Sequence, residues 1–122
     1  MIKNVCLTSI WSQDLNNLLP FYRDVVGLKP SLETPGFVMF GPHTGPALGL
    51  GTHSDVRGKN ADPARHIVAL EVDDCAAEYS RLKAAGVDFV EAPNRQGPGP
   101  TIATFRDPEG NLIQLAQFHE AG

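Results

Sequence analysis

The chain has 122 residues, of which 42% are hydrophobic and 20% charged, and its formal net charge is −4. This composition is typical of one globular domain large enough to bury roughly two thirds of its unfolded surface. Basic residues are scattered and outnumbered by acidic ones, which argues against nucleic-acid binding. The apolar runs are too short for a membrane-spanning helix. The two cysteines, Cys6 and Cys75, are expected to stay reduced, in a cytoplasmic protein.

The first half of the chain predicts one strand, one helix and three short strands. Residues 2–10 alternate as a strand does, and Ser12 or Asp14 can cap a helix that ends at Gly27. Pro20 lies inside the helical pattern and should kink the helix or begin a second segment. The three strands are expected at about 28–33, 36–41 and 46–51.

The second half repeats this order after a polar linker over residues 52–64. Residues 65–72 predict a strand, and Asp73 or Asp74 can cap a helix over residues 75–85. The remaining strands are expected at about 87–91, 101–106 and 111–117. The segment Asp107-Pro108-Glu109-Gly110 before the last strand has the composition of a tight turn.

The order β-α-β-β-β therefore occurs twice in a single domain over residues 1–122, with module one at about 1–51 and module two at about 65–118. Neither module could bury enough apolar surface by itself. We therefore expect an α+β fold, in which two βαβββ modules form a curved mixed sheet around an open cleft.

Three segments resemble a known superfamily: PFYRDVVGL at 20–28, HIVALEVDD at 66–74 and FRDPEGNLI at 105–113. They are similar to the vicinal oxygen chelate superfamily, which includes glyoxalase I, extradiol dioxygenases and bleomycin-binding proteins. The resemblance spans nearly the whole chain and implies the paired-module fold. It does not imply one activity, because this scaffold carries isomerases, oxygenases, transferases and non-catalytic binders.

The resemblance also implies where a metal would bind. In metal-dependent members four side chains hold a divalent ion, and the matching positions here are Asn4, Gly49, His66 and Gln114. Glycine offers no ligand, and amide oxygens bind transition metals more weakly than carboxylate or imidazole. We therefore expect no metal cofactor; if a divalent metal binds, His66 and Gln114 are its ligands. His53 could complete such a site, or could be a solvated loop residue.

Without a metal, the cleft is expected to hold a small molecule through apolar side chains and a few polar groups. The candidate ligand-binding residues lie on the predicted strands and one loop: Asn4, Cys6, Thr8, Phe37, Met39, His66, Arg95, Phe105 and Gln114. Val68 and Leu70 are expected to face the cleft too. The loop 94–100 is a candidate lid, in which Arg95 could clamp a carboxylate or phosphate or remain solvated. Trp11 could stack on a ligand, pack against the first helix or close a dimer interface.

These observations favour a glyoxalase/bleomycin-resistance-like protein that binds a small, partly apolar molecule without the usual metal. The alternative is a metal-dependent lyase, isomerase or dioxygenase of the same superfamily with an atypical ligand set. A third reading is a purely structural pairing domain. Whether the chain catalyses a reaction is left open. The expected partners are a small-molecule ligand and a second copy in a homodimer, with no nucleic acid and no membrane.

Overall fold

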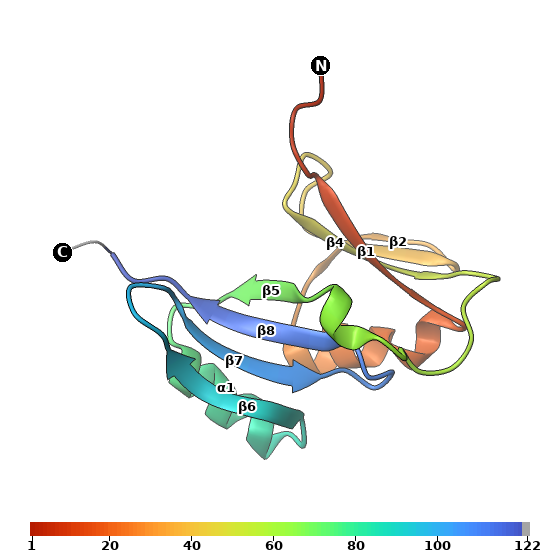
Figure 1. Cartoon of the computed structure of the whole chain (residues 1–122). Helices are drawn as coiled ribbons and strands as arrows, with labels where there is room; N and C mark the ends of the chain where they lie inside the picture. The colour runs from red at the N-terminus through yellow and green to blue at the C-terminus, as the bar shows by residue number, and fades with distance from the viewer. Residues whose placement is uncertain (121–122) are drawn as a thin grey trace. The chain divides into compact units, whose positions relative to one another are not determined.

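The structure is a computed structural model in which residues 1–120 are described. The chain divides into two compact units, Met1–Gly58 and a second unit that begins at Lys59. Each unit contains one four-stranded mixed sheet, ordered β1-β4-β3-β2 in the first and β5-β8-β7-β6 in the second (Figure 1). The fold is α+β, as the repeated order of elements predicts.

The strands of the first unit are β1 (Leu7–Ser12), β2 (Pro30–Glu33), β3 (Phe37–Phe40) and β4 (Ala47–Thr52). β1 runs parallel to β4, and the other neighbours are antiparallel. Two short helical segments lie between β1 and β2, a 3₁₀ turn over Leu15–Asn17 and a π-helical turn over Phe21–Val26.

Local signals explain how these two segments begin and end. The Asp14 side chain accepts a hydrogen bond from the backbone N–H of Asn16 at 3.0 Å and so caps the first segment. Pro20 stands at the start of the second segment, as one of the two expected outcomes predicts. Gly27 ends that segment in the left-handed conformation, with φ of 93°, which glycine adopts without strain.

The first strand begins later than the sequence pattern predicts. It pairs with β4 from Leu7 opposite Ala47 to Ser12 opposite Thr52, so it starts where its partner starts. Asn4 and Cys6 lie ahead of β1 and are exposed. The alternation over residues 2–10 therefore does not mark the strand, because hydrogen bonding to a neighbouring strand decides where a strand exists.

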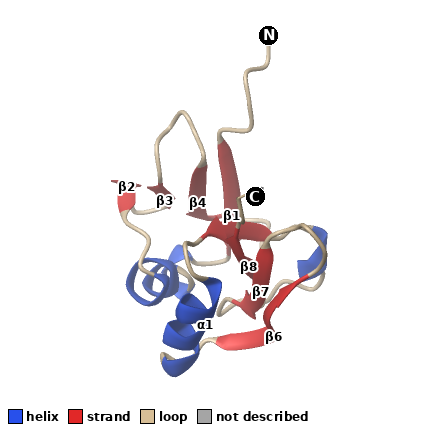
Figure 2. Ribbon diagram, turned by 90° about the vertical axis from the view of Figure 1, so that its left-hand side faces the viewer, coloured by secondary structure: helices blue, strands red, loops and turns tan. Residues whose placement is uncertain are grey.

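The second unit contains β5 (Val68–Glu71), α1 (Cys75–Ala84), β6 (Asp88–Arg95), β7 (Thr101–Arg106) and β8 (Leu112–Gln117), preceded by a 3₁₀ turn over Pro63–Arg65. The predicted bounds of β7 are confirmed, whereas β6 continues four residues past its expected end at 91. The helix α1 lies against one face of this sheet (Figure 2).

The core of the second unit lies between α1 and the sheet. Leu82 of α1 is 1% exposed, and Phe105 and Ile113 of the sheet are fully buried. Full burial of such side chains contributes about 1.5–3 kcal/mol each. One face of the sheet is thereby committed to the core, and only the opposite face can contribute side chains to a binding site.

Among the described residues, no helix has the length and apolar content needed to cross a lipid bilayer.

Candidate functional site

Gln114 lies on the face of the second sheet that does not carry the core. Its neighbours along β8, Ile113 and Leu115, are buried, and successive side chains on a strand point to opposite faces. Paired residues share a face, so Ala69 on β5 and Thr104 on β7 stand beside Gln114. The Gln114 amide Nε2 donates to the Thr104 hydroxyl oxygen at 3.5 Å, a long hydrogen bond.

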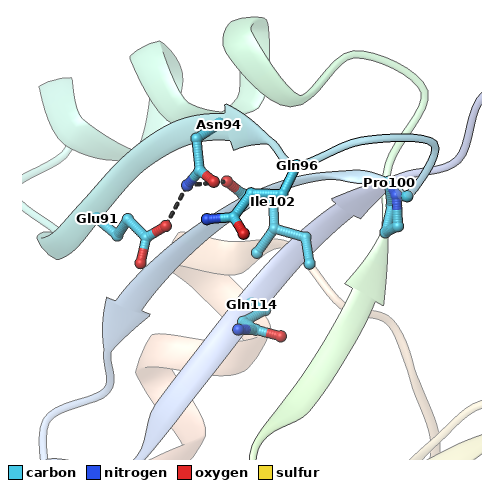
Figure 3. Close-up of a pocket in the computed structure, with 7 residues that line it drawn as sticks. Glu91, Asn94, Gln96, Pro100, Ile102 and Gln114 are labelled. Atoms are coloured by element: carbon cyan, nitrogen blue, oxygen red, sulfur yellow. Dashed lines mark hydrogen bonds between the residues drawn. The ribbon is translucent and has the colours of Figure 1, made fainter.

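A pocket of about 260 Å³ opens on this face, above β6, β7 and β8 (Figure 3). Seven residues line it: Glu91, Asn94, Gln96, Gly99, Pro100, Ile102 and Gln114. The lining combines a carboxylate, three carboxamides and a short apolar wall. That mixture is suited to a small ligand with one apolar part and a few hydrogen-bonding groups.

Two irregularities in β6 bring Glu91 and Asn94 to the same pocket. Residues three apart on a regular strand point to opposite faces. Here the pairing of β6 with β7 shifts between Phe89 and Glu91 and again between Glu91 and Asn94, so Glu91 pairs with Thr104 and Asn94 with Ile102. Such bulges redirect side chains and are common near binding sites. No alternating pattern in the sequence predicts this, and the sequence reasoning missed Glu91.

Hydrogen bonds hold the Asn94 side chain by its NH₂ group. Asn94 Nδ2 donates to the Glu91 carboxylate, to the carbonyl oxygen of Ala92 at 3.3 Å and to that of Ile102 at 3.4 Å. An amide NH₂ has only two hydrogens, so it is fully used by these partners. The carbonyl oxygen Oδ1 of Asn94 is therefore the end that remains for a ligand.

Arg95 follows this cluster as the last residue of β6. Its Nε donates to the carbonyl oxygen of Gly99 at 2.8 Å, across the turn that joins β6 to β7. The guanidinium thus braces the backbone of a pocket-lining residue, and Arg95 itself is not among the lining side chains. Because β6 extends to Arg95, the expected lid is shorter than the sequence indicates. Its role as a lid stays a prediction.

The first sheet carries two aromatic rings over a glycine strand. On β4, Gly49 pairs with Ser9 and Met39, and Gly51 pairs with Trp11 and Phe37. A Cβ added at Gly49 would lie 2.6 Å from Cζ of Phe37, and one at Gly51 would lie 2.3 Å from Cζ3 of Trp11. The rings therefore occupy the space in which side chains of β4 would stand. We call Trp11 and Phe37, lying over Gly49 and Gly51, the aromatic shelf.

The shelf is open enough to contact a ligand. Trp11 is 43% exposed, and its ring centroid lies 5.9 Å from that of Phe37 with an interplanar angle of 35°. The His53 ring lies edge-on to Trp11 at 5.6 Å. His53 Nδ1 accepts a hydrogen bond from the backbone N–H of Asp55 at 3.0 Å, so the proton of the neutral ring is on Nε2. Trp11 and Phe37 both pair with Gly51, so their side chains lie on one face of the sheet, whereas buried Leu50 points to the other face. This placement favours the stacking role of Trp11 over core packing.

The residues at the expected metal positions do not fit a divalent ion. Asn4 and His66 are exposed and lie ahead of β1 and β5, Gly49 offers no donor, and Gln114 offers only an amide. In the described part of the chain, no three His, Cys, Asp or Glu side chains gather as a potential metal site. A ligand side chain at Gly49 would also collide with the Phe37 ring. The metal-free state of the protein stays a prediction.

The expected orientation of several strand residues is wrong. Thr8 pairs with buried Leu48, away from the face of Gly49. Val68 pairs with Ile113, and Leu70 with Leu115, so both lie on the core side of the second sheet. Phe105 is likewise in the core, fully buried beside Ile113. A shift of one residue in the assumed register exchanges the two faces of a strand, and that shift explains the error in β1 and β5.

Phe37 and Met39 do lie together, on the face of Gly49, and Gln114 lines the pocket in the second unit. Asn4, Cys6 and His66 lie outside the strands. For the predicted residues that do not lie on the core side of a sheet, the ligand-binding role stays a prediction.

Comparison with known proteins is consistent with this fold and names the family. The family model described as the Glyoxalase/Bleomycin resistance protein/Dioxygenase superfamily matches residues 5–115. The chain belongs to this superfamily, of which vicinal oxygen chelate is another name.

Three similar proteins illustrate the range of the family. The uncharacterized protein YurT of Bacillus subtilis is 31% identical over 93% of this chain and 98% of its own length. The lactoylglutathione lyase of Salmonella typhimurium is 31% identical, covering 89% of this chain and 88% of the lyase. The crystal structure of a lactoylglutathione lyase from Agrobacterium tumefaciens superposes with a TM-score of 0.72 at 23% identity, over 96% of this chain and 95% of that one. This last likeness concerns the fold alone.

Proposed function

We propose that this protein is a metal-independent member of the superfamily that binds a small, partly apolar molecule. The observation that carries the proposal is the Phe37 ring, which lies where a side chain at Gly49 would stand. With glycine at one position and amides at two others, the set lacks the carboxylates that would balance a divalent charge. The same glycine and amide residues leave surfaces that suit an organic ligand.

Each unit offers a surface of the required kind. The aromatic shelf supplies exposed ring area, which contributes strongly to binding per residue. The pocket beside Gln114 supplies orienting polar groups next to Ile102 and Pro100. Small-molecule sites characteristically combine apolar area with a few placed polar groups.

The second candidate is a metal-dependent lyase, isomerase or dioxygenase with unusual ligands. It is favoured by the 31% identity to proteins named lactoylglutathione lyase. Under this alternative His66, the one imidazole among the four positions, would hold the ion with Gln114. The two candidates therefore differ in whether the protein binds a divalent metal through His66.

Metal analysis of the purified protein separates them. We expect far less than one equivalent of zinc, nickel, iron or manganese after mild preparation, and no rise in Tm when these ions are added, because a ligand that binds the native state must stabilise it. Substitution His66→Ala should leave both results unchanged. A stoichiometric metal that is lost in His66→Ala would overturn the proposal and support the alternative.

We further propose that the protein works as a homodimer in the cytoplasm. Modules of this superfamily pair within or between chains, and each unit here ends in edge strands, β1 and β2 or β5 and β6, that another strand could join. Cys6 and Cys75 are both free thiols, which suits a reducing compartment.

A further inference from the structure

We propose that the pocket beside Gln114 recognises a small amine in its cationic form, through the carboxylate of Glu91. This inference rests on the proposed binding function and gives the ligand a chemical class. It follows from the charge of the lining, from the hydrogen bonds that its side chains already make, and from its size.

Glu91 is the only charged side chain among the seven residues that line the pocket. The nearest basic side chain in sequence, Arg95, points its Nε to the carbonyl oxygen of Gly99 instead. An anion placed here would meet a carboxylate and no cation among the lining residues. A cation would meet a partner of opposite charge, and hydrogen bonds to charged groups are the stronger ones.

The hydrogen bonds already made point to the same class. The NH₂ group of Asn94 is used by Glu91 and two backbone carbonyls, and one N–H of Gln114 is used by Thr104. The acceptors that remain for a ligand are the second carboxylate oxygen of Glu91 and the amide oxygens of Asn94 and Gln114, beside the Gln96 carboxamide, which offers both donors and an acceptor. An ammonium group carries three donors and no acceptor, so it complements this set.

Figure 3 shows how these groups are arranged, with Asn94 directed at Glu91 and with Ile102 between this pair and Gln114. Ile102, Pro100 and Gly99 give the lining an apolar part beside the acceptors. The volume of about 260 Å³ is below the usual range for drug-sized ligands. A primary amine on a short apolar stem fits the charge of the lining, its free hydrogen-bond acceptors and the volume of the pocket.

The test is a titration of ¹⁵N-labelled full-length protein with benzylamine, benzyl alcohol and benzoate, followed by NMR. These probes share one ring and differ in charge. The side-chain NH₂ signals of Asn94, Gln96 and Gln114 report on the pocket directly. We expect benzylamine to shift these signals at lower concentration than benzyl alcohol, and benzoate to bind most weakly.

Two variants assign the preference to Glu91. Glu91→Gln keeps the shape of an exposed side chain and removes its charge. It should raise the Kd for benzylamine about fivefold, the upper end of what an exposed charge pair contributes. The affinity for benzyl alcohol should stay unchanged. Glu71→Gln removes the same charge from an exposed position of β5, outside the pocket lining, and should change the affinity for neither benzylamine nor benzyl alcohol.

The inference is overturned if benzoate or benzyl alcohol binds as tightly as benzylamine, or if Glu71→Gln has the same effect as Glu91→Gln. In both cases the pocket still binds a small molecule, so the proposed function survives. If no probe shifts the three amide signals, the pocket is not a binding site and the inference fails. The proposed metal-independence fails separately, through the metal analysis.

Discussion

At the scale of single residues, Gly49 and Gly51 shape the first sheet because they lack side chains. Their backbone lets the rings of Trp11 and Phe37 approach β4 more closely than any other residue would permit. Gly49 offers no donor at a position where a metal ligand was expected, and both glycines leave room for the exposed aromatic surface. The consequence can be measured with the chain's only tryptophan.

Substitution Gly51→Ala should destabilise the protein by about 1–3 kcal/mol, because the new methyl group would lie 2.3 Å from the Trp11 ring and force it to move. Chemical denaturation gives the change in the free energy of unfolding, and the tryptophan emission spectrum reports the movement of the ring. Gly36→Ala is the matched control: nothing lies within 4 Å of its added Cβ and its φ is not positive. Equal effects at both positions would show that the rings do not press on β4.

The two thiols should differ in reactivity, since Cys75 is fully buried and Cys6 is exposed. Burial, and secondly the charge of Asp74, raises the pKa of the Cys75 thiol. In the native protein a disulfide reagent should label one thiol quickly, and Cys6→Ser should abolish that fast phase. Rapid labelling of Cys75 in the native state would contradict the burial.

The same raised pKa makes stability depend on pH on the alkaline side. Above the ordinary thiol value of about 8.5, the unfolded chain releases the Cys75 proton while the folded chain still holds it. The stabilising contribution is therefore complete below that value and is lost as pH rises through the folded pKa. Cys75→Ala should show a flatter decline of the free energy of unfolding between pH 8 and 10.

At the scale of elements, α1 begins at a local capping residue, whereas the course of β6 depends on its pairing with another strand. The start of α1 is set by a single side chain, because Asp74 accepts a hydrogen bond from the backbone N–H of Ala77 at 3.1 Å. The path of β6 is set by its pairing with β7, which places two irregularities around Glu91. A local signal can thus be read from the sequence, whereas a bulge is visible only once both strands are in place.

Substitution Asp74→Ala should cost about 1 kcal/mol of stability, because an N–H in the first turn of α1 loses its partner. Asp73→Ala provides the control, since Asp73 is exposed and does not cap the helix. Thermal denaturation of both variants measures the difference. A larger loss of stability in Asp73→Ala than in Asp74→Ala would show that Asp73, and not Asp74, caps the helix.

At the scale of the whole molecule, the chain is two units of the same architecture. Each has a sheet in which its first strand runs parallel to its last, β1 with β4 and β5 with β8. Apolar side chains remain exposed on the edge strands, where Leu32 of β2 is 48% exposed and Val90 of β6 is 43% exposed. Association with a second copy would remove such surface from water.

We therefore expect sedimentation velocity to give a mass of twice 13.1 kDa at micromolar concentration. A sedimentation coefficient that does not change on dilution would indicate a tight dimer, while a falling one would indicate a weak dimer. A mass of 13.1 kDa over the whole concentration range would contradict the proposed homodimer.

The order of the elements, the α+β class and the family can all be predicted from the amino-acid sequence. Short-range signals carry this information: Pro20 begins a helical segment, Gly27 ends it, and Asp107 accepts the backbone N–H groups of Glu109 and Asn111 in the turn before β8. Each acts within a few residues, so it can be read without knowledge of the rest of the chain.

Which side chains share a face of a sheet depends on long-range strand pairing, and it is visible only in the folded chain. Thr8, Val68 and Phe105 were expected on the binding face and lie on the core side. For Thr8 and Val68 the reason is a shift of one residue in the assumed register, which exchanges the two faces of a strand. Glu91 entered the pocket through a bulge that no local pattern marks. Phe37 came to fill the space at Gly49 because residues of two strands are aligned by long-range pairing, which no short segment of sequence contains.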